Sequence, residues 1–190
     1  MAVFAPVQKI DGYLPIEDHG LIGDGTTAAL VGRDGAISWM CVPRFDSAPL
    51  FCRILDVKRG GAFTVAPEGL RESRRFYEGD TGVLVTEMRC PSGVIRLTDA
   101  LSLHSGADLS EDVPAGRSEL LRSVRVLEGR ARVRIEIEPR GGVNIEAHGE
   151  GLRLRCPSHP HVELHFHAKG PRPVRSLKNR VTRTFFPRNL

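Results

Sequence analysis

Residues 43–49 combine several side-chain types that could bind or orient a ligand. Arg44, Phe45, Asp46 and Ser47 follow directly after an apolar run. A guanidinium, an aromatic ring, a carboxylate and a hydroxyl at the end of a rigid strand can hold polar groups in fixed positions. A tight turn, in which Asp46 caps Ser47 and pairs with Arg44, accounts for the same residues without any ligand. From these residues alone, the tight turn is the preferred interpretation.

Histidines and a glutamate gather on one face of an expected strand at 162–168. These side chains are His161, Glu163, His165 and His167. Residues two apart on a strand are separated by about 6.6 Å, so a neighbouring pair could share a metal ion, but three in a row span too far for one zinc ion. A solvated polar face is the preferred interpretation, and no cofactor or metal is predicted.

Two further patterns suggest phosphate or nucleic-acid binding and are better explained otherwise. The glycine-rich segment 23–27 lacks the Gly-Lys-Ser/Thr ending of a nucleotide-binding loop, and a strand follows it, so it is predicted to be a turn. Basic and acidic side chains share the outward face of the expected strand 131–137: Arg130, Arg132, Arg134, Glu128, Glu136 and Glu138. Such mixed charge is typical of a solvated surface, so no specific nucleic-acid partner is predicted.

The elements that would position these residues are nearly all strands. The apolar runs 27–32 and 36–42 flank Asp34-Gly35, which predicts a hairpin with the positive φ values of a tight primed turn. Strict alternation on the second run would place Ile37, Trp39 and Cys41 on one face. Hairpins are also expected between 81–90 and 94–103 and between 119–127 and 131–137. Further strands are expected at 62–66, 143–147, 152–156 and 162–168.

The only segment with helical periodicity is the short apolar stretch 49–55. Strands joined by glycine-containing turns are typical of an antiparallel sandwich. The sequence therefore predicts an all-β protein, an antiparallel β-sandwich with less than about one-tenth helix, against about one-third in an average globular chain.

Composition limits the class of protein further. A chain of 190 residues is expected to form one domain, and no apolar run is long enough to span a membrane. Four scattered cysteines without Cys-x-x-Cys spacing favour free thiols in a reducing, cytoplasmic compartment. The net charge of +4 comes from residues 169–190, where seven basic residues occur without an acid, so residues 1–168 carry a net charge of about −3.

The run PIEDHGLIGDGTTAALVGRDGAISWMCVPRFDSAPLFCRILD, followed by Gly60-Gly61-Ala62-Phe63 and Ala66-Pro67, closely resembles the N-terminal domain of bacterial glucoamylase- and trehalase-like proteins of glycoside hydrolase family 15. The resemblance is strong through Asp99-Ala100-Leu101 and weaker up to residue 168. It implies a β-sandwich of the super-sandwich type in residues 1–168, which in the family precedes a catalytic (α/α)6 barrel. No segment resembles that barrel, so it is expected to be absent, and residues 169–190 are expected to form an irregular or disordered basic tail.

The resemblance implies a non-catalytic role. Hydrolysis of a glycosidic bond needs two carboxylates flanking that bond. Glu17, Asp18, Asp24 and Asp46 do not form an evident pair, and the family's catalytic glutamates lie in the barrel, so no catalytic residue is assigned. In relatives the sandwich would pack against the barrel in cis.

The expected interface, which could also lie near substrate, consists of Trp39, Arg44, Phe45, Asp46 and Ser47. An α-glucoside or oligosaccharide is the implied ligand of the full-length relatives, with trehalose and malto-oligosaccharides left open. Without the barrel, exposed apolar residues such as Leu50, Phe51 and Leu55 would favour self-association. The alternative is a stand-alone β-sandwich protein that binds carbohydrate or another partner.

Overall fold

The computed structural model describes residues 2–104, 116–148, 151–167, 175–177 and 180–185, and its regular structure is almost entirely β. The strands are β1 (Ala5–Pro6), β2 (His19–Gly23), β3 (Ala28–Gly32), β4 (Ala36–Cys41), β5 (Pro49–Phe51), β6 (Ala62–Pro67), β7 (Glu72–Tyr77), β8 (Leu84–Cys90), β9 (Gly93–Leu103), β10 (Gly116–Gly129), β11 (Val133–Glu138), β12 (Asn144–His148), β13 (Gly151–Arg155), β14 (Glu163–Phe166), β15 (Arg175–Leu177) and β16 (Arg180–Phe185). Within the described residues the only helical element is a single 3₁₀ turn, η1 (Ile16–Asp18). The all-β prediction is confirmed.

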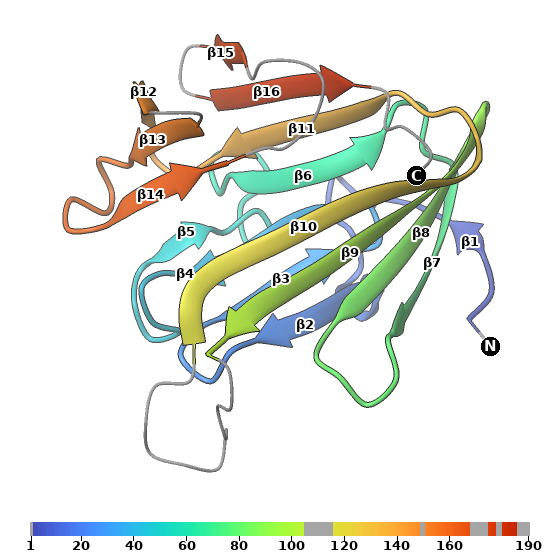
Figure 1. The fold of residues 1–190 in the computed structure, drawn as a ribbon, viewed down its shortest axis with the longest axis horizontal. Helices are drawn as coiled ribbons and strands as arrows, with labels where there is room; N and C mark the ends of the chain where they lie inside the picture. The colour runs from blue at the N-terminus through green and yellow to red at the C-terminus, as the bar shows by residue number, and fades with distance from the viewer. Residues whose placement is uncertain (1, 105–115, 149–150, 168–174, 178–179, 186–190) are drawn as a thin grey trace.

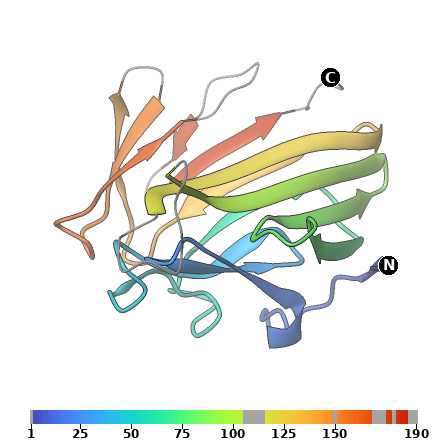
Figure 2. The same ribbon diagram turned by 60° about the horizontal axis from the view of Figure 1, so that its bottom comes forward.

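Two large antiparallel sheets pack face to face (Figures 1 and 2). One sheet has the order β1-β7-β8-β9-β10, and the other has the order β15-β16-β11-β6-β4-β3-β2, with β5 paired to β4. A small third sheet has the order β12-β13-β14. Side chains from both large sheets form one hydrophobic cluster, which includes Ile22, Val31 and Val133 from one sheet and Leu84 and Ile95 from the other. The predicted sandwich is therefore the observed architecture.

The predicted hairpin between 27–32 and 36–42 forms as β3 and β4. In its turn, the N–H of Gly35 donates to the C=O of Gly32 at 2.9 Å. Within Gly32-Arg33-Asp34-Gly35, only Gly35 has a positive φ, at 77°. The central residues of this turn, Arg33 and Asp34, do not have positive φ values, so the predicted primed turn was wrong, and the left-handed residue is Gly35 at the end of the turn. A side chain at Gly35 would also collide with the carbonyl oxygen of Val65.

A β-bulge at Ser38 changes which side chains of β4 share a face. Leu30 pairs with Trp39, whereas Val31 pairs with Ile37, so Ser38 is an extra residue on β4. Ile37 is fully buried in the core, while Trp39 is half-buried and outside the core cluster. The prediction that Ile37 and Trp39 share a face was wrong, because a bulge interrupts the alternation on which that prediction depended.

The chain crosses from one large sheet to the other between β10 and β11. β10 pairs with β9, whereas β11 pairs with β6 and β16. The expected hairpin between 119–127 and 131–137 was therefore wrong. The N–H of Arg130 donates to the C=O of Ser92 at 2.9 Å, which holds the end of β10 against the β8–β9 turn while the chain leaves for the other sheet.

Other predictions are confirmed or corrected strand by strand. The hairpin between 81–90 and 94–103 forms as β8 and β9. Residues 49–55, expected to have helical periodicity, contain strand β5 followed by turns. Residues 175–177 and 180–185 form β15 and β16, so the expected irregular tail was wrong there. The other residues of 169–190 lie outside the described residues.

A buried arginine joins the two large sheets. Arg122 on β10 pairs with Asp99 on β9, with 2.8 Å between Nε and Oδ1, and their side chains are 3% and 0% exposed. The same guanidinium donates to the carbonyl oxygens of Phe63 on β6 at 2.6 Å and of Gly35 in the β3–β4 turn at 2.8 Å, both of which belong to the facing layer. It also lies 4.7 Å from the centre of the Phe63 ring. The charge of Arg122 is thus satisfied from both sheets.

Candidate functional site

The loop of residues 43–49, here called the 43–49 loop, leaves the end of β4 and is anchored to the turn between β2 and β3. The N–H of Phe45 donates to the C=O of Thr26 at 3.0 Å. The hydroxyl of Thr27 donates to the C=O of Cys41 at 2.5 Å. These two bonds hold the turn between β2 and β3 beside the start of the 43–49 loop, although the whole β3–β4 hairpin separates the two segments in the sequence.

The glycine-rich segment 23–27 provides this anchor and is a turn, as predicted. The buried carboxylate of Asp24 accepts the backbone N–H groups of Thr26 and Thr27 at 2.9 and 2.8 Å. A carboxylate that closes its own turn in this way fixes the backbone locally. The carboxylate of Asp24 therefore accounts for the conformation of this segment without a bound phosphate.

Within the 43–49 loop, polar groups satisfy one another. The N–H of Ser47 donates to the C=O of Arg44 at 3.1 Å, and the N–H of Arg44 donates to Oγ of Ser47 at 3.3 Å. Nε of Arg44 lies 3.2 Å from Oδ1 of Asp46, with side chains 65% and 60% exposed. The predicted Arg44–Asp46 pair is confirmed, whereas the predicted cap of Asp46 on Ser47 was wrong, because the N–H of Ser47 donates to the C=O of Arg44. The loop presents this ion pair and the exposed ring of Phe45 to solvent.

Trp39 and the apolar residues around the loop divide between surface and core. Trp39 is half-buried on β4, just before the 43–49 loop begins, so all five predicted interface residues belong to one strand-and-loop unit. Leu50 and Phe51, predicted to be exposed, are each only 3% exposed and belong to the core cluster, because β5 turns them inward. Leu55 is exposed, as predicted.

The thiol of Cys41 lies at the start of this unit but is a poor candidate nucleophile. Burial raises the pKa of Cys41, and the neighbouring Cys52 and Asp46 raise it further. Because the thiolate is the reactive form, a thiol with a raised pKa stays neutral and unreactive near neutral pH. Cys41 is therefore assigned no role in covalent chemistry.

A histidine that the sequence did not single out braces the 43–49 loop. His159 is buried, and its Nε2 lies 2.8 Å from the C=O of Ala48. Its Nδ1 lies 2.9 Å from Oγ of Ser158, which also donates to the C=O of Arg140 at 2.8 Å. His159 and Ala48 are 111 residues apart, and no local pattern links them.

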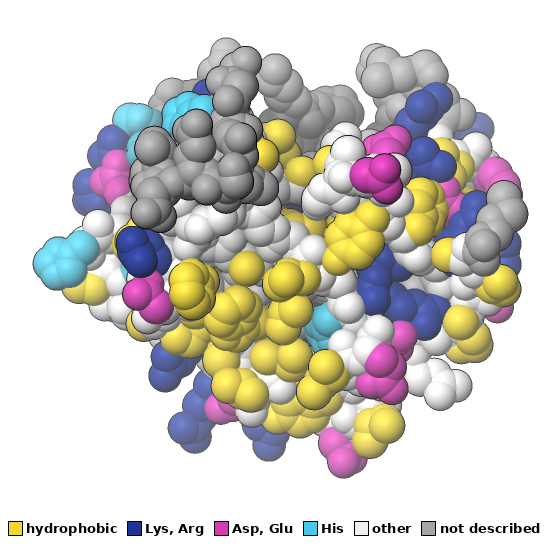
Figure 3. Space-filling model, turned by 90° about the horizontal axis from the view of Figure 1, so that it is seen from below, with side chains coloured by type: hydrophobic (Ala, Val, Ile, Leu, Met, Phe, Trp, Pro, Cys, Tyr) yellow, Lys and Arg dark blue, Asp and Glu magenta, His cyan; other side chains and the backbone are white. Residues whose placement is uncertain are grey.

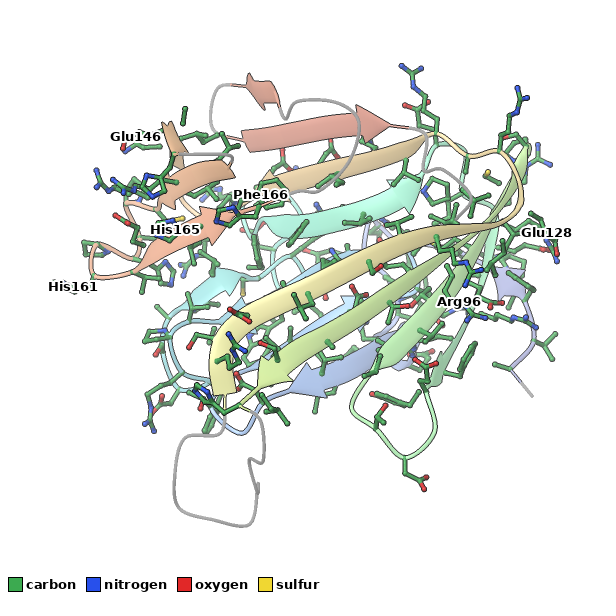
Figure 4. The ribbon with its side chains drawn as sticks, viewed as in Figure 1. Arg96, Glu128, Glu146, His161, His165 and Phe166 are labelled. Atoms are coloured by element: carbon green, nitrogen blue, oxygen red, sulfur yellow. The ribbon has the colours of Figure 1, made fainter. Side chains whose placement is uncertain are left out.

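The predicted polar face of 162–168 is confirmed as a solvated surface. Glu163, His165 and His167 are exposed, and Nε2 of His165 lies 3.0 Å from Oε1 of Glu163. His161 sits at the far tip before β14, away from His165 and Phe166 (Figure 4). Within the described residues, no group of three potential ligands could hold a metal ion.

Slight burial alone would raise the pKa of Glu163, but hydrogen bonding from Arg155 and the charges nearby lower it overall.

Three of the four carboxylates considered for hydrolysis have structural partners. Asp18 pairs with Arg33 at 3.0 Å, Asp24 accepts backbone N–H groups, and Asp46 pairs with Arg44. Their positions in the fold are explained by these contacts without a substrate. Within the described residues, no helix is long and apolar enough to cross a membrane.

Comparison with known proteins finds a match to a family model and partial similarity to several trehalases. The family model described as "Trehalase-like, N-terminal" matches residues 11–167. A trehalase from Thermoplasma volcanium is 40% identical over 93 residues, which are 47% of this chain and 15% of that protein. A trehalase from Mycolicibacterium smegmatis is 30% identical over 156 residues, which are 73% of this chain and 23% of that protein.

A trehalase from Mycobacterium tuberculosis is 29% identical over 138 residues, which are 67% of this chain and 20% of that protein. The matched part of this chain thus spans only about a fifth of the length of these relatives. No solved structure matches the chain. Since the family model covers most of the sequence, the chain belongs to the family of trehalase-like N-terminal domains.

Proposed function

We propose that residues 1–168 are the non-catalytic β-sandwich domain of a trehalase-like α-glucoside hydrolase of glycoside hydrolase family 15, and that they pack against a catalytic (α/α)6 barrel. The observation that carries this proposal is the match of residues 11–167 to a trehalase-like N-terminal domain. The relatives named trehalase are several times longer than the matched part, which leaves room for a separate catalytic domain. Their names favour trehalose over malto-oligosaccharides as the substrate.

The 43–49 loop and Trp39 are proposed to lie at the interface with that domain. The loop is anchored through Phe45 and braced through Ala48, yet the ion pair of Arg44 and Asp46 is exposed to solvent. A loop that is held in one conformation loses little entropy when a partner covers it. A cytoplasmic location is also proposed, supported by four buried cysteines that are all free.

Activity assays test this proposal in two steps. The purified chain should release no glucose from trehalose, maltose or starch. Co-expression with the part of the Mycolicibacterium smegmatis trehalase that follows the matched segment should yield a complex that hydrolyses trehalose. Turnover by the chain alone that is abolished by one carboxylate substitution, such as Asp46→Asn, would overturn the non-catalytic role.

A stand-alone carbohydrate-binding role is the second candidate. An open groove of about 840 Å³ lies between the N-terminal segment and the outer face of β6 and β11, lined among others by Lys9, Asp34, Thr64 and Arg134. The residues described along it include polar partners for hydroxyl groups but no aromatic ring on which a sugar could stack. Calorimetric titration with trehalose and maltotriose separates the two roles, since measurable binding by the chain alone would favour this candidate.

A further inference from the structure

Three apolar side chains form a row across neighbouring strands on the outer face of the eight-stranded sheet. Leu21 on β2 pairs with Leu30 on β3, which pairs with Trp39 on β4. Directly paired residues project from the same face of a sheet. Leu21 is 54% exposed, Leu30 and Trp39 are half-buried, and none of the three belongs to the core cluster.

Other exposed apolar residues lie in neighbouring segments. Ile16 in η1, immediately before β2, is 75% exposed, and Phe45 in the 43–49 loop is 59% exposed. Seen from below, the molecule shows hydrophobic side chains gathered together on this side (Figure 3). Single exposed apolar residues are ordinary on a protein surface, whereas a contiguous group is typical of an interaction site.

The outer face of the other large sheet provides the contrast. Leu121 on β10 is 56% exposed, nearly the same as Leu21. Its cross-strand partner is Ala100, and its neighbours along that face of β10 are Glu119 and Ser123. Leu121 is therefore an isolated apolar residue on a polar face, and it offers a matched control for Leu21.

The free edge beside this row is closed to strand addition. The hydroxyl of Tyr77 accepts the N–H of Leu21 at 3.0 Å and lies 2.8 Å from its C=O. Arg75 donates to the carbonyl oxygens of Asp18 at 2.7 Å and His19 at 2.8 Å. An edge whose outward backbone groups already have side-chain partners is a poor template for another strand. A partner at β2 must therefore approach the face of the sheet.

We propose that the outer face of β2, β3 and β4, centred on Leu21, Leu30 and Trp39, is the surface that docks the remaining part of a longer trehalase-like polypeptide. The inference rests on the proposed function and adds where and how the contact is made. The occupant is indicated by the relatives, in which about four-fifths of the polypeptide lies outside the matched part. The contact is face-on and apolar, with the 43–49 loop at its border.

The single tryptophan of the chain allows a direct test, because Trp39 is one of the three residues of this row and pairs directly with Leu30. The 190-residue chain is labelled with 5-fluorotryptophan, which gives one fluorine resonance. It is then titrated with the unlabelled part of the Mycolicibacterium smegmatis trehalase that follows the matched segment. Binding of the unchanged chain should shift or broaden the Trp39 resonance.

Variants then locate the surface. Leu21→Asp should weaken binding at least about ten-fold, because it places a carboxylate in an apolar contact, while Leu121→Asp should leave binding within about two-fold. If Leu21→Asp does not fold, Leu21→Ser, which introduces a small neutral side chain, is used in its place, and it should also weaken binding. Thermal unfolding of each variant shows which ones retain the native structure.

The remaining outcomes separate this inference from the function on which it rests. Binding that leaves the Trp39 resonance unchanged, or that is weakened equally by Leu21→Asp and Leu121→Asp, overturns this surface and leaves the proposed function standing. Absence of binding by the unchanged chain overturns both. A Trp39 shift that depends only on the concentration of the chain itself would assign the surface to a second copy and so overturn the proposed occupant.

Discussion

Two of the arginine–aspartate ion pairs in this molecule differ sharply in position, since one lies inside the sandwich and the other lies on its surface. Arg122 and Asp99 are 3% and 0% exposed, with 2.8 Å between Nε and Oδ1. Arg44 and Asp46 are 65% and 60% exposed, with 3.2 Å between the same atoms. The residue types are identical, so differences in behaviour must come from their surroundings.

The two environments give the two pairs different roles. The guanidinium of Arg122 also donates to the carbonyl oxygens of Phe63 on β6 and of Gly35 in the β3–β4 turn, so it connects the two layers. Removing one partner of a buried pair leaves a charge without compensation, which costs about 3–5 kcal/mol. An exposed pair contributes about 0–1 kcal/mol, because water already solvates both ions. We therefore infer that Arg122 stabilises the fold, and we propose that Arg44 contacts a partner domain.

Replacing Arg122 gives the largest expected effect. Arg122→Leu should lower the free energy of unfolding by about 3–5 kcal/mol, because Asp99 loses its counter-charge in a dry environment. Urea unfolding followed by circular dichroism measures this change. The double variant Arg122→Leu with Asp99→Leu is the control and should recover part of the loss. A loss no larger than that of a surface pair would show that water reaches Asp99.

Glu87 provides an intermediate case, since its carboxylate is 1% exposed while its partners Arg74 and Arg96 are 32% and 36% exposed. Burial alone would raise the pKa of Glu87, but hydrogen bonds from Arg96 and Arg74 lower it overall. The stabilisation is therefore present above the ordinary glutamate pKa and is lost as the pH falls through the lower pKa of the folded state. Glu87→Gln should lower stability by about 2 kcal/mol near neutral pH.

The pH dependence checks the cause of that loss. The difference in unfolding free energy between the unchanged chain and Glu87→Gln should shrink as the pH is lowered below the ordinary glutamate range. Urea unfolding at several pH values measures it, with Glu72→Gln, whose carboxylate pairs with Arg89 but is 36% exposed, as a control expected to change little. If this difference in unfolding free energy stays constant with pH, the loss comes from packing and not from the charge of Glu87.

Replacing Arg44 gives the smallest expected effect on the isolated chain. Arg44→Ala should change the free energy of unfolding by less than about 0.5 kcal/mol, because the ion pair that it breaks is exposed. Thermal unfolding at low and high salt is the measurement, and Asp46→Ala serves as the matched variant. A loss comparable to that of Arg122→Leu would contradict the contrast between the two pairs.

Local sequence patterns predicted the β3–β4 and β8–β9 hairpins, the turn at 23–27, the polar face at 162–168 and the Arg44–Asp46 pair of the 43–49 loop. Each of these depends on neighbouring residues: alternation selects a strand, and a glycine with positive φ at position 35 permits the turn. Alternation also predicted the inward side of 131–137, where Val133 and Ile137 are 0% and 5% exposed. Resemblance of an ordered run of residues predicted a trehalase-like N-terminal domain, which the match to residues 11–167 confirms.

Only the tertiary structure decided which strands pair and which distant residues meet. The sequence patterns of β10 and β11, joined by a short glycine-containing turn, favour a hairpin, yet the two strands belong to different sheets. The contacts of Arg122 with Gly35 and of His159 with Ala48 join positions 87 and 111 residues apart. Likewise, the bulge at Ser38 sets Trp39 in line with Leu30 and Leu21. Alternation determines the faces of a strand, whereas its partner and register depend on how the whole chain buries its apolar surface.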